Sequence, residues 1–175
     1  SPGSNTNISN GVISSNGKGV SYGGVSNVTL SDSTINSNTG YGIYFSGSGV
    51  GANTITNNNF WNCSTACIGM VDASEVGQTF VGNYLNSSSG YGIYMFVTGG
   101  TGEADNNLFK DMVIENTTLV SVNMTAEDGR SMTNNTFLNV TYDDESVVSL
   151  HASSFVELIR KWYVDVNATY SNGTV

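Results

Sequence analysis

The stretch TGYGIYF at residues 39–45 returns as SGYGIYM at residues 89–95, 50 positions later. Apolar residues recur at half of that spacing in two series, which are Ile43, Ile68 and Ile93, and Ile35, Phe60 and Leu85. Self-similarity at a fixed period of roughly 20–50 residues is the sequence signature of a repeat architecture. The pentapeptide GYGIY therefore marks alternate units of a repeat that is about 25 residues long.

Six such units account for most of the chain. Their approximate bounds are 5–24, 25–49, 50–74, 75–100, 101–129 and 130–155. Inside a unit, short runs such as residues 28–30 and 54–56 are rich in β-branched residues and are bounded by Asn, Gly and Ser, which is typical of strands between tight turns. Before residue 153 no segment holds a helical period with caps. The pattern predicts an all-β fold, a parallel β-solenoid of about six coils over residues 1–155.

Asparagine is expected at the corners of these coils, because Asn and Gly supply the left-handed conformation that tight bends demand. Asn36 and Asn86 fall in one column of the repeat, with Trp61 between them. Asparagines stacked in register can also form ladders of side-chain amide hydrogen bonds. The sequence leaves both roles, turn former and ladder, open for this column.

Residues 156–175 differ from the repeats. Residues 161–170 alternate in polarity over a longer run than any earlier strand, and Asn172 and Gly173 then form a hairpin-turn dipeptide. We expect a C-terminal β-strand here that caps the solenoid, begins a further β domain, or is donated to a neighbouring subunit. Donation predicts that Trp162, Val164 and Val166 are buried against another chain.

The charge of the chain excludes two classes of partner. The formal net charge is −9, with five Lys and Arg in total, and charged residues are 11% of the chain against roughly 25% in ordinary globular proteins. Nucleic acid and anionic lipid surfaces require clustered cations, so we expect neither as a partner. No apolar run approaches the ~20 residues of a membrane span, so we expect none.

The repeats resemble those of right-handed parallel β-helix proteins, in the NosD-like, carbohydrate-binding and sugar-hydrolase repeat class. The likeness rests on INSNTGYGI at residues 35–43 and LNSSSGYGI at residues 85–93, which are similar to the family's pattern of Asn, Gly and Ile in each coil. Residues 161–173 look like the strand that follows such helices in archaeal secreted surface proteins. The resemblance implies a right-handed coil, and it leaves function open because the same solenoid serves enzymes and inert scaffolds.

N-glycosylation is the modification that the sequence favours. Ten Asn-x-Ser/Thr sequons are present, at Asn7, Asn27, Asn62, Asn86, Asn116, Asn123, Asn134, Asn139, Asn167 and Asn172. Glycans on several of them would face solvent and hydrate the rod, which predicts an exported, extracellular or cell-surface protein. The alternative is that a chain rich in Asn, Ser and Thr contains sequons through composition alone.

Cys63 and Cys67 are the only cysteines, and with the lone His151 they are too few for a closed zinc site. An even number of cysteines in an exported chain favours a disulfide. Fully extended residues at this spacing lie ~13 Å apart, beyond disulfide reach, so the predicted Cys63–Cys67 bridge requires residues 64–66 to turn. The alternative is two small apolar side chains in the core.

Catalysis and metal binding find little support in the acidic residues. Asp32 and Asp111 occupy equivalent places in units two and five, so they should lie several coils apart and cannot act as a pair. The densest acidic run is Asp143, Asp144 and Glu145. It predicts a solvated loop or, alternatively, a calcium site. We expect no enzyme activity and no cofactor, with calcium left open.

Two functions remain. The leading hypothesis is a non-catalytic extracellular structural protein, a glycosylated cell-surface or filament-forming subunit that self-associates through its solenoid ends or its C-terminal strand, because such ends present unpaired strand edges. The alternative is a carbohydrate-binding or polysaccharide-processing module, lyase-like or hydrolase-like. In that case the tyrosines beside glycines would make a sugar-stacking face, namely Tyr22, Tyr41, Tyr44, Tyr91 and Tyr94. Otherwise these rings stack between coils and stabilise the sheet.

Overall fold

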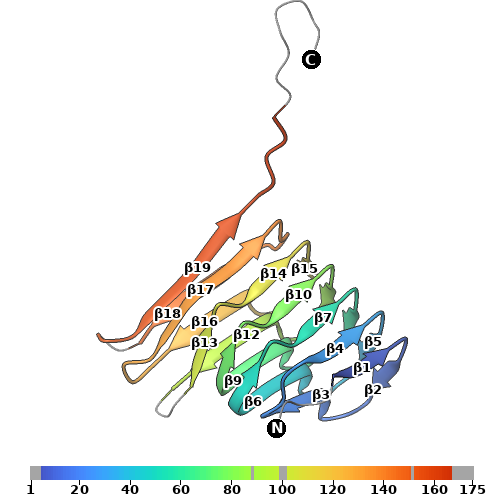
Figure 1. Ribbon diagram of the computed structural model, residues 1–175. Coiled ribbons are helices and arrows are strands. Elements are labelled where there is room, and N and C mark those ends of the chain that lie inside the picture. Colours follow the sequence, from blue (N-terminus) through green and yellow to red (C-terminus); the bar gives the residue numbers. More distant parts are fainter. Residues whose placement is uncertain (1–4, 88, 99–101, 151, 167–175) are drawn as a thin grey trace, which may run out of the picture.

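The computed structural model describes residues 5–87, 89–98, 102–150 and 152–166. In these residues every regular element is a β-strand, and paired strands run parallel. Figure 1 shows coil stacked upon coil, with β1 and β19 at opposite ends. The all-β solenoid of about six coils that the repeat predicts is confirmed.

Three parallel sheets form the walls of the solenoid, and each coil adds strands to them in turn. Sheet A contains β1 (Thr6–Ser9), β4 (Val28–Ser31), β7 (Thr54–Thr56), β10 (Thr79–Val81), β14 (Leu108–Lys110), β17 (Ser131–Leu138) and β19 (Phe155–Lys161). Sheet B contains β2 (Val12–Ser14), β5 (Thr34–Asn36), β8 (Asn59–Trp61), β11 (Tyr84–Asn86) and β15 (Val113–Glu115). Sheet C contains β3 (Lys18–Gly23), β6 (Tyr41–Gly51), β9 (Ala66–Val76), β12 (Tyr91–Val97), β16 (Val122–Ala126) and β18 (Glu145–Ser149), and β13 (Glu103–Asp105) also pairs with β9.

The columns predicted from the 25-residue spacing form the core. Ile43 pairs with Ile68 and Ile68 with Ile93, and all three are fully buried on the inner side of sheet C. The second predicted column is buried on the inner side of sheet B and consists of Ile35, Phe60 and Leu85. Each coil is too short to bury these side chains alone, so stacking creates the core.

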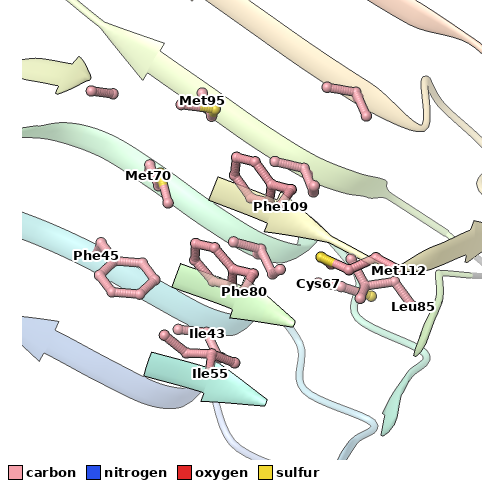
Figure 2. Packing of buried hydrophobic residues seen from close by; sticks show 14 of the residues in the cluster. Ile43, Phe45, Ile55, Cys67, Met70, Phe80, Leu85, Met95, Phe109 and Met112 are labelled. Carbon is pink, nitrogen blue, oxygen red and sulfur yellow. The ribbon is translucent and has the colours of Figure 1, made fainter. Parts of the chain in front are cut away.

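Aromatic rings stack along the inner side of sheet A. The ring centroids of Phe80 and Phe109 lie 4.8 Å apart, and those of Phe109 and Phe137 lie 4.5 Å apart. Figure 2 shows the first of these pairs in the interior. Because parallel strands are themselves spaced by about 4.8 Å, rings in register fill the core with little void.

The glycines of GYGIY lie where the backbone of one coil crowds its neighbour. A Cβ atom on Gly42 would lie 2.6 Å from the carbonyl oxygen of Cys67. On Gly92 it would lie 2.2 Å from Ile114 Cγ2 and 2.6 Å from the carbonyl oxygen of Ser121. These separations are well below carbon contact distances of roughly 3.5–4.0 Å. The motif recurs because these two coils leave no room for a side chain at this place.

We expect the substitution Gly92→Ala to lower the free energy of unfolding by about 1–3 kcal/mol or more, because overpacking of a filled core costs that much. Urea unfolding followed by circular dichroism measures the effect. Gly23→Ala is the matched control, since a Cβ there meets no atom within 4 Å. An equal loss in both variants would contradict the crowding at Gly92.

Left-handed residues mark the corners of the coils. The corner between sheets A and B consists of Asn10, Asp32, Asn57, Gly82, Asp111 and Asn139, whose φ angles are between 50° and 63°. Asp32 and Asp111 therefore share one column, with two coils between them, as the sequence predicts. Asparagine and aspartate tolerate this conformation better than most residues, which explains their abundance here.

Amide ladders are present, but in columns other than the predicted one. Asn58 Oδ1 accepts a hydrogen bond from the Ser33 N–H at 3.0 Å, and the Asn58 N–H donates to Asn83 Oδ1 at 3.0 Å. A second ladder runs through buried amides one coil apart, namely Asn53, Gln78, Asn107 and Asn135. Asn36 and Asn86 do flank Trp61 in register, but they lie half-buried on the outer face of sheet B.

A C-terminal strand is present at the start of the expected segment, residues 156–175, and not over its alternating part. β19 (Phe155–Lys161) pairs in parallel with β17 and continues sheet A. Residues 162–166 contain no strand, so within the described part of 161–170 only Lys161 lies in a strand. Trp162, Val164 and Val166 are exposed, and their burial against another chain stays a prediction. Asn167 and Asn172 lie outside the described residues.

Candidate functional site

An aromatic strip covers part of the outer face of sheet C. We define it as Tyr41, Tyr44, Tyr91, Tyr94 and Phe96, all half-buried. Strand alternation places Tyr44, Tyr94 and Phe96 outside, because the residues on either side of Tyr44 and Tyr94 point into the core. Tyr41 and Tyr91 lie three residues earlier, and each has its ring against the next tyrosine of its strand. Four of the five tyrosines that the sequence singled out are thus brought together. Tyr22 is not among them, because it is buried and its ring stacks on Phe45 at 4.6 Å.

Ring contacts hold the strip together. Tyr41 and Tyr44 have centroids 4.7 Å apart, and Tyr91 and Tyr94 have centroids 5.0 Å apart. Gly69 lies between the two pairs and leaves the space that the Tyr41 ring occupies, since a Cβ there would be 2.3 Å from that ring. The strip therefore spans coils two to four, with the Tyr41 ring filling the space beside Gly69 on the middle coil. Such packing suits both expected roles, sheet stabilisation and sugar stacking.

Charged groups flank the strip on both sides. Lys18 Nζ lies 3.4 Å from the centroid of the Tyr44 ring. Burial raises the pKa of Tyr94, and the neighbouring Tyr91, Glu127 and Asp72 raise it further. The arrangement offers rings for an apolar sugar face and carboxylates for its hydroxyl groups.

Beside the strip, Thr98 donates hydrogen bonds to two acidic residues. The Thr98 N–H donates to Asp72 Oδ1 at 2.9 Å, and the Thr98 hydroxyl donates to Asp128 Oδ2 at 3.1 Å. Hydrogen bonds to charged acceptors are stronger than neutral ones, so these carboxylates are held in place. Sequence reasoning missed these acids, because Asp72 lies within β9 and Asp128 lies in the turn after β16, far apart in the sequence.

A second aromatic surface, on the outer face of sheet B, was not predicted as a site. Trp61 is 40% exposed, and its ring centroid lies 5.2 Å from that of Tyr84. The Tyr84 hydroxyl donates to Glu115 Oε1, and Asn86 Nδ2 donates to the Tyr84 hydroxyl at 3.2 Å. The hydrogen bond to Glu115 is the main cause that raises the pKa of Tyr84. We call Trp61, Tyr84 and Glu115 the Trp61 platform, and Asn86 lies beside it.

The sequon asparagines lie on the outside of the solenoid. Of the eight in described residues, six are exposed, namely Asn7, Asn27, Asn62, Asn116, Asn134 and Asn139. Asn86 and Asn123 are half-buried in strands of sheets B and C. Five of the exposed six have left-handed φ angles of 51–60°. Corner geometry thus explains why so many of these asparagines are accessible.

The two cysteines are free, fully buried thiols, and no disulfide joins Cys63 and Cys67. They are therefore small apolar side chains in the core, which was the alternative to the predicted bridge. Burial raises the pKa of the Cys67 thiol well above its usual value, and a hydrogen bond with Cys63 raises it further. Cys63 Sγ lies 3.8 Å from the carbonyl oxygen of Trp61. Figure 2 shows Cys67 deep in the core, beside Leu85 and Met112.

The acidic run takes part in contacts within the last coil. Asp144 Oδ1 accepts a hydrogen bond from the Ser121 N–H at 2.8 Å. Glu145 Oε2 accepts from the Tyr142 hydroxyl at 2.5 Å and lies 3.0 Å from Arg160 Nη2. Among the residues that the structure describes, no group of three or more His, Cys, Asp or Glu side chains is placed to hold a metal ion. Calcium binding by the run stays a prediction without geometric support.

Comparison with known proteins identifies the class. The family model described as "Right handed beta helix region" matches residues 1–109, which is more than half of the 175 residues. The chain therefore belongs to the right-handed β-helix family, and the handedness implied by the resemblance is confirmed. No curated protein matches the chain. Within the described ranges, no helix is long and apolar enough to cross a membrane.

Proposed function

We propose that this chain is a non-catalytic structural element of a cell surface, exported and N-glycosylated, and similar to the NosD-like and archaeal surface β-helix proteins. The observation that carries the proposal is the placement of the sequons. None of the eight described sequon asparagines lies in the core, and four of them occupy exposed left-handed positions between strands. A glycan at such a corner extends into solvent without disturbing the sheets.

Site-resolved glycopeptide mass spectrometry on the secreted protein tests this function. We expect several of the exposed corner sequons to be occupied and the protein to be recovered outside the cell. Intact mass on the same sample reports the total glycan load and the state of the two thiols. A secreted chain without any glycan, or a chain retained in the cytoplasm, would contradict the proposal.

Self-association through the ends of the solenoid is part of this proposal. Within the described ranges, the terminal strands of sheets A and C, which are β1, β19, β3 and β18, have a strand neighbour on one side only, so their outer edges resemble templates for another strand. Leu150 and Phe155, near the C-terminal end, are 59% and 55% exposed. Negative-stain microscopy of concentrated protein should reveal rods longer than one solenoid. Single particles at every concentration would remove the filament-forming role and leave the surface role.

A second candidate function is polysaccharide binding at the aromatic strip, favoured by its continuity and its flanking carboxylates. On this hypothesis Tyr91→Ala should weaken binding about 2- to 10-fold, since one aromatic contact contributes about 0.5–1.5 kcal/mol. Titration calorimetry against acidic and neutral polysaccharides measures the change. Tyr163→Ala is the control, because Tyr163 is exposed beyond the last strand. Absence of binding by the unmodified protein at millimolar sugar would exclude this candidate.

A further inference from the structure

We propose that Asn86 carries an N-glycan whose first pyranose ring packs on the Trp61 platform. This inference rests on the proposed N-glycosylation and assigns one site and one contact within it. The glycan would then stabilise the wall of sheet B in addition to hydrating the rod.

The position of Asn86 differs from that of the corner sequons. Asn86 lies within β11, two residues after Tyr84, so both side chains lie on the outer face of sheet B. On the adjacent coil its direct partner in register is Trp61. Strand partners have Cβ atoms roughly 4.5–5.5 Å apart, which is within reach of one sugar ring.

The nitrogen that would carry the sugar is already aimed at the platform. Asn86 Nδ2 donates to the Tyr84 hydroxyl at 3.2 Å, while Tyr84 is 5.2 Å from Trp61 by ring centroid. A ring attached to Nδ2 therefore starts beside both aromatic rings. The apolar C–H face of a pyranose suits an indole that is 40% exposed, and Glu115 provides an acceptor for sugar hydroxyls.

The modification itself is a substitution at the anomeric carbon. The Asn86 amide nitrogen bonds to C1 of a phosphate-activated sugar, the bond between C1 and the phosphate oxygen breaks, and the phosphate-bearing carrier leaves. The amide loses one proton and keeps the other. The glycosylated nitrogen thus keeps one N–H as a hydrogen-bond donor beside the Tyr84 hydroxyl.

Tryptophan fluorescence in a single-tryptophan protein provides the test. The chain has two Trp, so Trp162→Phe leaves Trp61 as the only reporter. This protein is produced in a host that glycosylates Asn-x-Ser/Thr and, in parallel, in one that does not. Ser88→Ala removes the Asn86 sequon while keeping Asn86 itself, and Thr141→Ala removes the distant Asn139 sequon as the matched control. Glycopeptide mass spectrometry gives the occupancy of each site.

We expect glycosylation of Asn86 to shift Trp61 emission to shorter wavelength and to reduce its quenching by acrylamide. Ser88→Ala should abolish both effects in the glycosylating host and lower the melting temperature by about 2–4 °C, which corresponds to loss of one such contact in a chain of this size. Thr141→Ala should change neither. In the non-glycosylating host all three proteins should fluoresce alike.

Each contrary outcome is distinguishable. If other sequons are occupied and Asn86 is not, the inference is wrong while the proposed function stands. If Asn86 is occupied but Trp61 fluorescence is unchanged, the glycan does not pack on the platform. If fluorescence instead follows loss of the Asn62 sequon in Ser64→Ala, the contact belongs to the adjacent corner. If no sequon is occupied, both the inference and the proposed function fail.

Discussion

Asn58→Leu should remove about 3 kcal/mol or more from the free energy of unfolding, although the side chains are similar in size. Asn58 Oδ1 accepts from the Ser33 N–H, and Asn58 Nδ2 donates to the Leu30 carbonyl at 3.0 Å. The same Nδ2 also donates to Asn83 Oδ1 at 3.1 Å. Leucine leaves these buried groups without that partner, and each unsatisfied group costs about 1–3 kcal/mol.

Asn59→Leu is the matched control for this prediction, because Asn59 is the next residue and is exposed on the outer face of sheet B. Urea denaturation of both variants and of the unmodified protein measures the difference in stability. Hydrogen exchange should also show faster exchange of the Ser33 amide in Asn58→Leu. Equal stability of the two variants would mean that the ladder contributes little beyond the backbone pairing.

The repeat allowed the fold to be predicted because, in a solenoid, residues at the same place in successive coils have the same burial. A side chain recurring every 25 residues must lie in one column if the coils stack, and the Ile43, Ile68 and Ile93 column does so. The same logic placed Asp32 and Asp111 at one corner. It also gave the Asn36, Trp61 and Asn86 column its correct register.

The sequence did not show which asparagines form ladders, because asparagines with different roles follow one another along the chain. Asn57, Asn58 and Asn59 follow one another, and they are respectively an exposed corner residue, a buried ladder residue and an exposed strand residue. Composition is the same at all three positions, so only the path of the backbone distinguishes them. The Trp61 platform was missed for a related reason, since the repeat spacing places Trp61 and Asn86 in one column but does not show that their side chains point outward.

Polarity alternation alone misplaced the C-terminal strand. Residues 161–170 alternate well, yet the strand that forms is β19 (Phe155–Lys161). Its register against β17 places Arg160 opposite Phe137, and Arg160 is held by Tyr142 and Glu145 of the last coil. Pairing with the open edge of sheet A therefore decided where the strand forms, and the longer alternating run at residues 161–170 did not. Tertiary context often overrides such local β-propensity.

Phe109→Ala should be the most disruptive single change in the core, with a loss of about 3–5 kcal/mol typical of truncating a buried phenylalanine. Phe109 is fully buried and stacks on a ring on each side, Phe80 and Phe137. One substitution therefore weakens two interfaces between coils. In a solenoid each coil contacts only its neighbours, so stability is close to a sum of coil and interface contributions.

This nearest-neighbour logic predicts where the damage appears. Within sheet A, the Phe137 ring stacks on one ring only, that of Phe109. Phe137→Ala should therefore mainly destabilise the last coil. Phe109→Ala should instead let the C-terminal coils exchange their amides faster while the first three coils keep their protection. Hydrogen exchange by mass spectrometry resolves the two patterns, with Phe155→Ala, an exposed position, as the control. Uniform loss of protection along the chain in Phe109→Ala would instead mean that the coils unfold as one cooperative unit, and that the core does not behave as a stack of separable interfaces.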